Sequence, residues 1–180
     1  MKKITIGIVL ALLCGYGNSW AQAPASIKFL TVGDTLPASL VFKNVINSPS
    51  SKIPLSDFSD KLLLLDFWAS WCTSCAKSLP KVDSLRQELG DDFSAILVSS
   101  YRNPETTATV QKFSQRYQRT NGNPNSFPIV LADSTVSLLL DVPSLPHYVW
   151  VWNRRLIAIT KKPLSACAAR ELVHGYRLTH

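Results

Sequence analysis

The sequence contains the stretch LLLLDFWASWCTSC at residues 62–75, in which an apolar run leads directly into two closely spaced cysteines. Because residues 62–68 are apolar on both faces, they predict a β-strand in the middle of a sheet that is covered on both sides. Cys72 then stands where a helix should begin. Free amide groups at a helix N-terminus stabilise a thiolate and lower the pKa of the thiol. The stretch therefore predicts a buried strand that places a nucleophilic cysteine at the start of a helix.

The segments that follow alternate between helical and extended patterns. Helical spacing predicts a helix after Cys72 that runs to about residue 89, where Gly90 ends it. Beyond it we expect a strand at 93–99, an amphipathic helix at 104–119, a strand at 127–131, a short helix at 136–140, a hairpin of 147–152 with 156–160, and a closing helix at 164–176. Turn residues between short apolar stretches in residues 27–60 predict an N-terminal hairpin. The order predicts an α/β fold, a central mixed β-sheet with helices on both faces.

The first 21 residues differ from the rest of the chain. Lys2 and Lys3 precede an apolar run at residues 4–13, and small and polar residues follow up to Ala21. This order is typical of a secretory signal peptide cleaved after Ala21, which leaves residues 22–180 as one exported domain, periplasmic or in the cell envelope. The apolar run is shorter than the roughly 20 residues of a membrane span. An uncleaved anchor, or a lipoprotein acylated at Cys14, is the less favoured alternative.

Composition narrows the class of partner. The chain has 46% hydrophobic and 17% charged residues, which is ordinary for a globular domain. Its net charge is +7, but the basic residues do not form the cluster interleaved with aromatic residues that marks a nucleic-acid-binding surface. We therefore expect no nucleic-acid partner.

Three cysteines remain after export, and two of them are separated by only two residues. Cys72 and Cys75 have the spacing of a redox-active dithiol. A stable structural disulfide and half of a zinc site are the alternatives, but a structural zinc needs four ligands and no second pair at metal spacing follows. Cys167 lies in the predicted closing helix, and we expect it to be a buried free cysteine. A third redox thiol is the alternative for Cys167.

The residues around the dithiol resemble the active-site segment of the thioredoxin superfamily. The matching positions are Asp66, Phe67, Trp68, Ala69, Trp71, Cys72, Cys75 and Pro80. Pro146 falls where that family has a cis-proline facing the dithiol. The signal peptide, the N-terminal hairpin, the Gly33-Asp34 stretch and the room for an additional helix before Pro146 make the chain similar to the exported TlpA-like branch of thiol-disulfide oxidoreductases.

This resemblance implies a thioredoxin-like fold with an inserted helix before the cis-proline strand. It also implies that no cofactor or metal is bound, that the substrates are disulfide-containing exported proteins, and that a membrane electron-donor protein recycles the dithiol. The chain departs from thioredoxin in two places, since His147 follows Pro146 where threonine is usual, and Thr73-Ser74 separates the cysteines. Both departures bear on the strength and direction of the redox reaction.

The expected roles follow from these matches. Cys72 attacks a substrate disulfide, and Cys75 resolves the resulting mixed disulfide. Asp66 is expected to be a buried carboxylate with a raised pKa that takes the proton of Cys75; an exposed aspartate at a strand edge is the alternative. Trp71 is expected to contact substrate rather than pack in the core.

Leu145 and Pro146, joined by a cis peptide bond, are expected to pair with an extended substrate segment. His147 lies near the site by this prediction and is a candidate to tune the thiolate.

Three other functions stay open at this point. A disulfide oxidase or isomerase would use the same residues as a reductase. A peroxiredoxin would carry threonine and proline ahead of a lone cysteine, whereas here Trp71 precedes the pair. A thioredoxin-fold module that binds exported peptides without turnover would not need Cys72 and Cys75.

Overall fold

The computed structural model describes residues 28–121 and 127–179, so the expected signal peptide at residues 1–21 lies outside the described residues. The strands are β1 (Val41–Lys43), β2 (Val45–Ile46), β3 (Lys52–Pro54), β4 (Leu62–Phe67), β5 (Phe93–Ser100), β6 (Ile129–Asp133), β7 (His147–Trp152) and β8 (Arg155–Thr160). The helices are α2 (Thr73–Leu89), α3 (Thr107–Asn121), α4 (Val136–Leu139) and α5 (Ala166–Thr179), with short 3-10 turns at Leu55–Phe58 and Gly90–Asp92.

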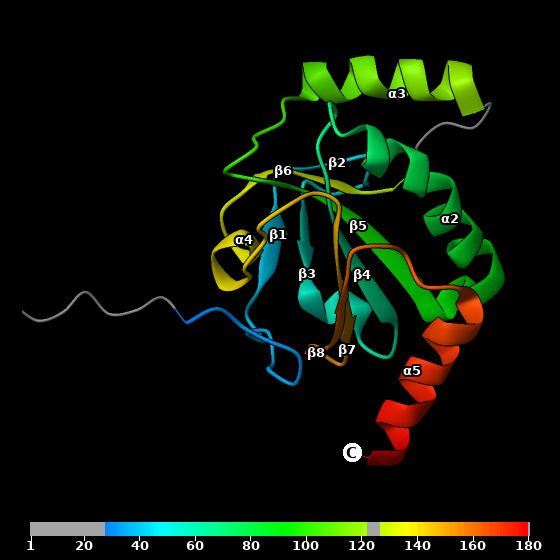
Figure 1. Cartoon of the computed structure of the whole chain (residues 1–180). Helices are drawn as coiled ribbons and strands as arrows, with labels where there is room; N and C mark the ends of the chain where they lie inside the picture. The colour runs from blue at the N-terminus through cyan, green and yellow to red at the C-terminus, as the bar shows by residue number, and fades with distance from the viewer. Residues whose placement is uncertain (1–27, 122–126, 180) are drawn as a thin grey trace, which may run out of the picture.

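A six-stranded mixed sheet forms the centre of the molecule, in the order β2-β6-β5-β4-β7-β8 (Figure 1). Strands β4, β5 and β6 run parallel, while β7 is antiparallel to both β4 and β8. All six residues of β4 are buried, as its apolar sequence predicts for a strand with neighbours on both edges and layers on both faces. The expected α/β architecture is therefore confirmed.

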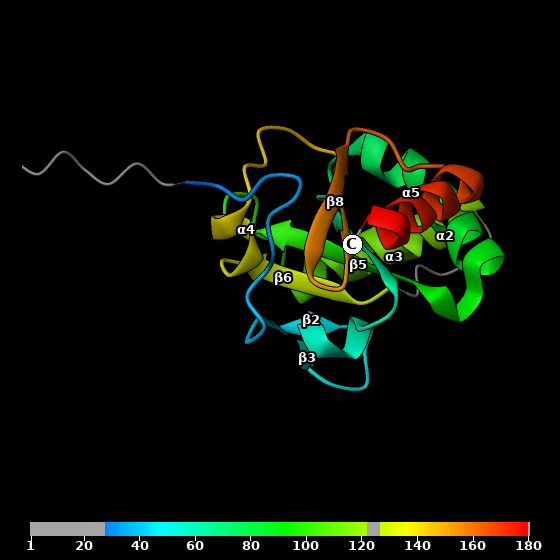
Figure 2. The ribbon, with the colours of Figure 1, turned by 90° about the horizontal axis from the view of Figure 1, so that it is seen from below.

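Three helices cover one face of the sheet. Figure 2 shows α2, α3 and α5 gathered on one side of the strands. Leu79 and Val82 of α2 pack there with Phe113 of α3 and Ala169 of α5, around Trp68 at the end of β4. This apolar cluster includes Cys72 and Cys75 at the N-terminus of α2 and continues along that helix to Leu85, so it holds the helix against the sheet.

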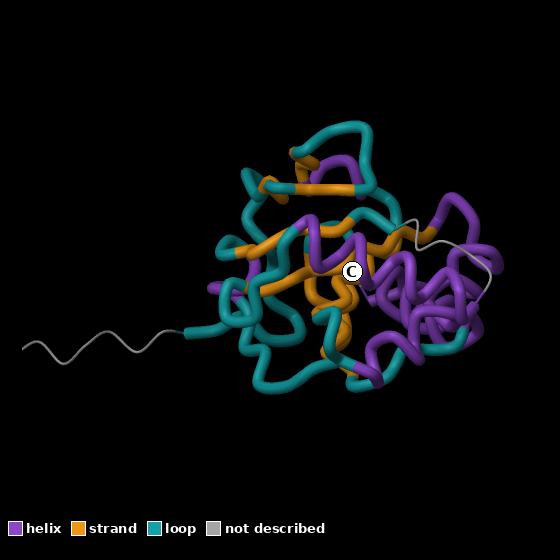
Figure 3. Tube along the Cα trace, turned by 90° about the horizontal axis from the view of Figure 1, so that it is seen from above, coloured by secondary structure: helices purple, strands orange, loops and turns teal. Residues whose placement is uncertain are grey.

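The N-terminal region covers the other face. Leu36, Leu40 and Phe42 pack with Leu55 and with Val136 of α4 against this side of the sheet. Strands β1 and β3 form an antiparallel pair, which confirms the expected hairpin, and Figure 3 shows this region as a layer outside the main sheet.

One strand of the N-terminal region was not expected from the sequence. Strand β2 lies between β1 and β3 in the chain, but it leaves the hairpin and pairs antiparallel with β6 at the edge of the main sheet. Asn44 and Asn47 flank it with positive φ angles of 55° and 56°, a conformation that asparagine tolerates better than most residues. These two turns carry the chain into the sheet and out again.

The expected helix boundaries hold within a few residues. α2 ends where expected, at Gly90, whose φ of 57° is unfavourable for residues with a side chain. α3 begins at Thr107 instead of residue 104, because the Thr106 hydroxyl accepts the backbone N–H of Thr109 and caps the helix.

Within the described residues, no helix combines the length and the apolar character that crossing a membrane requires.

Candidate redox site

Cys72 and Cys75 form a disulfide at the point where β4 gives way to α2. Their Cα atoms are 5.3 Å apart. Cys72 occupies the N-cap position of α2, and its sulfur accepts the backbone N–H of Cys75 at 3.2 Å. After reduction, this donor and the helix N-terminus favour the thiolate form of Cys72. Cys72 therefore stands at the start of a helix, as the sequence predicts.

The two sulfur-bearing residues differ in accessibility, and their neighbour Trp71 is exposed. Cys75 is 1% exposed and Cys72 is 6% exposed, whereas Trp71 is 66% exposed. A substrate can therefore reach Cys72 more readily than Cys75. The large aromatic surface of Trp71 stands in solvent beside Cys72 and does not pack in the core, which removes the alternative of core packing.

Asp66 lies in the middle of the sheet, six residues before Cys72. It is completely buried between β5 and β7, so the alternative of an exposed strand-edge carboxylate is wrong. Among the described residues, neither carboxylate oxygen has a hydrogen-bond partner. Burial raises the pKa of Asp66 to about 8, because the charged form loses its hydration without gaining a partner. The side chain is therefore able to bind and release a proton near neutral pH.

Tyr148 faces Asp66 and was missed in the sequence. It is the cross-strand neighbour of Asp66 in the β4–β7 ladder and is also fully buried. Burial raises the pKa of the Tyr148 hydroxyl, and the charge on Asp66 raises it further. One sequence signal could have identified Tyr148. Side chains alternate between the two faces of a strand, and a tyrosine on the same sheet face as a buried carboxylate is a candidate polar neighbour.

The peptide bond between Leu145 and Pro146 is cis, as the resemblance implied. The loop that contains it ends at His147, which pairs with Phe67, the last residue of β4. Because Cys72 follows Phe67 by five residues, the cis-proline loop lies beside the segment that leads to the disulfide. The structure thus brings the Cys72 segment and the Leu145–Pro146 segment to the same edge of the sheet.

His147 occupies the opposite face of the sheet from Tyr148, because successive residues of a strand point to opposite faces. Its ring is buried and packs edge-on against Phe67, with ring centroids 6.1 Å apart. Burial lowers the pKa of His147 to about 4, the positive charge of Lys161 adds to this effect, and Asp141 opposes it. His147 is therefore neutral near pH 7 and supplies no positive charge to the thiolate.

Two charged side chains of the α3 region hold the loop before Cys72, and the sequence did not identify either one. The buried carboxylate of Glu105 accepts the backbone N–H of Ser70 at 2.6 Å and the hydroxyl of Thr109 at 2.5 Å. Arg116 donates to the carbonyl of Ser70 at 3.0 Å. Both backbone groups of Ser70, two residues before the nucleophile, are therefore fixed by charged side chains.

Cys167 corrects the expectation of a buried thiol. It is free and exposed on α5, and its sulfur points toward the carboxylate of Glu171 at 3.6 Å. The buried residues of α5 are Ala166 and Ala169, which lie one position before and two positions after Cys167. Cys167 lies in the first turn of α5, beside Arg170, which reaches the carbonyl of Glu88 near the C-terminal end of α2.

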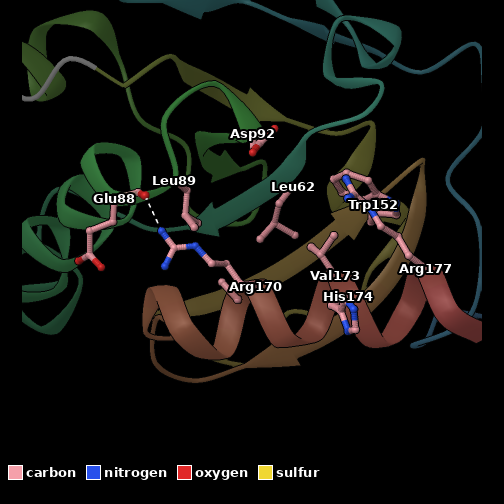
Figure 4. Close-up of a pocket in the computed structure, with 10 residues that line it drawn as sticks. Leu62, Glu88, Leu89, Asp92, Trp152, Arg170, Val173, His174 and Arg177 are labelled. Carbon is pink, nitrogen blue, oxygen red and sulfur yellow. Dashed lines mark hydrogen bonds between the residues drawn. The ribbon is translucent and has the colours of Figure 1, made fainter.

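A pocket of about 380 Å³ lies at that same end of α2 (Figure 4). Leu62, Leu89 and Trp152 form its apolar part, and Arg170 and Arg177 project from α5 around it. The Arg177 guanidinium stacks over the Trp152 ring at 4.6 Å from its centroid. Because Cys72 caps the other end of α2, this pocket is separate from the redox centre.

Comparisons with known proteins agree with this geometry. Residues 31–149 match the Redoxin family. The chain is 26% identical over 146 residues to the thioredoxin-like protein YneN of Bacillus subtilis, with 81% of each protein covered. It is 29% identical over 156 residues to the thiol-disulfide oxidoreductase ResA of the same organism, covering 81% of this chain and 79% of ResA.

Among solved structures, the thioredoxin domain of a thiol-disulfide oxidoreductase from Bacteroides vulgatus superimposes with a TM-score of 0.58. The identity is 21%, over 82% of this chain and 98% of that domain, and this likeness shows the fold alone. The family match, the thioredoxin-like fold and the Cys72–Cys75 disulfide agree with one another. The chain therefore belongs to the Redoxin family and is a thiol-disulfide oxidoreductase of the TlpA-like branch of the thioredoxin superfamily.

Proposed function

We propose that this protein is exported and reduces disulfides in other exported proteins through Cys72 and Cys75. The observation that most supports this function is the arrangement of the two cysteines: Cys72 is 6% exposed at a helix N-terminus, next to the exposed Trp71, and Cys75 is 1% exposed. Such a pair suits a nucleophile that meets a protein substrate and a resolving thiol that stays protected.

The reaction proceeds in two exchanges. The Cys72 thiolate attacks one sulfur of the substrate disulfide, which breaks the substrate S–S bond and leaves one substrate thiol and a mixed disulfide on Cys72. The Cys75 thiolate then attacks the Cys72 sulfur and releases the second substrate thiol. Two electrons pass to the substrate, and the Cys72–Cys75 disulfide remains.

Asp66 is the proposed acceptor for the proton of Cys75 in the second exchange. Its pKa of about 8 lies close to the ordinary pKa of a thiol, about 8.5, so that transfer between the two groups is nearly balanced. Trp71 and the Leu145–Pro146 segment are the proposed substrate contacts, Trp71 through its exposed ring and the segment through strand-like pairing.

Export rests on the signal-peptide pattern of residues 1–21, which leaves residues 22–180 as the mature domain. A protein that reduces substrates outside the cytoplasm needs its own disulfide reduced again. We therefore propose a membrane electron-donor protein as the second partner, with exported disulfide-containing proteins as the first.

The reduction potential of the Cys72–Cys75 pair tests the direction. Purified mature protein is equilibrated in dithiothreitol or glutathione buffers while the fluorescence of Trp68 and Trp71 is followed. A potential near that of thioredoxin, about −270 mV, supports the reductase. One near that of DsbA, about −120 mV, replaces it with an oxidase or isomerase that uses the same residues.

A variant with both Cys72 and Cys75 changed to Ser is the control. It should lose all turnover of a disulfide substrate. Full biological activity of this variant would instead indicate a module that binds exported peptides without turnover.

A further inference from the structure

Lys161 contacts both ends of the cis-proline loop. Its ammonium nitrogen lies 2.9 Å from the Ser144 hydroxyl oxygen and 3.1 Å from Nδ1 of His147. Ser144 precedes the Leu145–Pro146 peptide bond and His147 follows it. Lys161, the residue directly after β8, therefore contacts the residues on both sides of the segment that is proposed to pair with substrate.

The direction of these hydrogen bonds is fixed by the chemistry of the ammonium group. A protonated lysine donates and does not accept, so Nδ1 of His147 is the acceptor and the ring proton resides on Nε2. This assignment requires a neutral imidazole, which is consistent with the buried ring and its lowered pKa. Protonation of His147 would place a second positive charge against Lys161, so the neutral ring and the ammonium stabilise one another.

The contacts with Ser144 and His147 leave part of the ammonium unused. An ammonium group has three N–H donors, and these contacts use two of them. The Lys161 side chain is exposed, and among the described residues no carboxylate lies within ion-pair distance of it. Its third donor and its positive charge therefore face solvent at the edge of the cis-proline loop.

Two other positively charged side chains, those of Arg116 and Arg102, lie at this end of the sheet. Arg116 is held against the carbonyl of Ser70, and Arg102 stacks over the exposed ring of Tyr101 just after β5. The carboxylate of Glu105 is buried and is bound by Ser70 and Thr109, so it is not a surface group that a substrate segment can contact. Asp141 also acts on His147 through space, and its negative charge opposes the effect of Lys161 there.

We propose that Lys161 is a specificity-determining residue that binds a carboxylate of an acidic polypeptide segment lying along the cis-proline loop, while the same ammonium group positions that loop through Ser144 and His147. This inference rests on the proposed function, because the loop binds substrate only if the protein exchanges disulfides with polypeptides. It identifies the substrate class as segments with acidic residues near the reactive disulfide.

Lys162 provides a matched control. It is the next residue in the chain and is also exposed, but its side chain contacts neither Ser144 nor His147. Lys161→Met and Lys162→Met remove the same charge from neighbouring positions. Lys161→Arg keeps the charge at the proposed site.

The test uses two synthetic peptides that contain the same internal disulfide, one flanked by glutamates and the other by lysines. The rate constant for oxidation of the reduced protein by each peptide is followed through tryptophan fluorescence. The wild type should react at least about threefold faster with the acidic peptide, the ratio expected from one solvent-accessible charge pair. Because salt screens such a pair, about 0.5 M NaCl should reduce the ratio toward one.

Lys161→Met should lower the ratio of the two rates by about threefold, the contribution of one charge pair, whereas Lys161→Arg and Lys162→Met should leave it close to that of the wild type. Equal rates of the wild type with both peptides, or an equal loss in Lys161→Met and Lys162→Met, would overturn the inference while leaving the proposed function intact. Failure of the reduced wild type to react with either peptide, or with a small aromatic disulfide, would overturn the proposed function itself.

Discussion

Asp66 on β4 lies directly opposite Tyr148 on β7, and both side chains are fully buried on the face of the sheet that α2 covers. Of the two residues, only Asp66 ionises in the physiological pH range, because the raised pKa of Tyr148 keeps its hydroxyl protonated there. Ionisation of Asp66 therefore takes place beside a neutral polar group and otherwise in an apolar environment.

Asp66→Asn should slow the second exchange more than the first. An amide cannot accept the proton of Cys75, whereas attack by Cys72 uses a thiolate stabilised by the helix N-terminus. Rapid quenching with acid should show the mixed disulfide on Cys72 accumulating in the variant, with the first phase little changed. In the wild type, the second phase should accelerate as the pH rises toward about 8, where Asp66 ionises. Equal slowing of both phases would contradict the proposed role.

The same substitution should alter the dependence of stability on pH. The pKa of Asp66 is raised from 3.8 to about 8 on folding, so the folded state binds more protons than the unfolded state between these two values. Stability is therefore lost as the pH rises through this window. Denaturant unfolding at several pH values should show the wild type losing on the order of a few kcal/mol relative to Asp66→Asn, at about 1.4 kcal/mol per unit of pKa difference. Parallel curves for the two proteins would contradict the buried ionisation.

Tyr148→Phe should raise the pKa of Asp66. Removal of the hydroxyl leaves the ionised carboxylate in a less polar environment, which penalises the charged form further. The pH midpoint of the second exchange should move upward in the variant, while its limiting rate at high pH stays close to that of the wild type. A midpoint that stays in place would show that the hydroxyl does not act on Asp66.

Glu105→Gln should destabilise the protein and loosen the segment before Cys72. The Glu105 carboxylate accepts a backbone N–H and a hydroxyl, and hydrogen bonds to a charged group contribute about 1.5–3 kcal/mol. We expect a loss of about 1–2 kcal/mol in denaturant unfolding, because the amide of glutamine still offers one acceptor. Alkylation of Cys72 in the reduced variant should also change in rate.

Glu88→Gln is the control for this variant, since the Glu88 side chain is exposed and only its backbone carbonyl is used by Arg170. Equal stability losses in the two variants would mean that the contact with Ser70 contributes nothing specific.

The long, strongly patterned segments were predictable because local sequence decides them. β4, β7 and α2 each carry enough apolar or helical residues to identify them, and the two cysteines place the redox centre at the junction of β4 and α2. Strand β2 was not predictable, since its two residues owe their conformation to pairing with β6, more than 80 positions away in the chain.

The site residues that the sequence missed have the same explanation. Glu105, Arg116 and Lys161 act through contacts with Ser70, Ser144 and His147 that join different elements. No local pattern marks such a residue, because each one looks like an ordinary polar residue of a loop or a helix face. Cys167 was misplaced for a different reason, since a shift of one residue in helix phase separates a buried position from an exposed one.

The exposed thiol of Cys167 has a practical consequence for capturing partners. A Cys75→Ser protein should hold a substrate covalently on Cys72, and such adducts are usually identified as larger bands on non-reducing gels. Two copies of the protein joined through Cys167 would also run as a larger band, although the redox centre takes no part in that bond. Trapping is therefore cleanest with residues 22–180, which lack Cys14, in a Cys75→Ser/Cys167→Ser background, where every covalent adduct reports on Cys72.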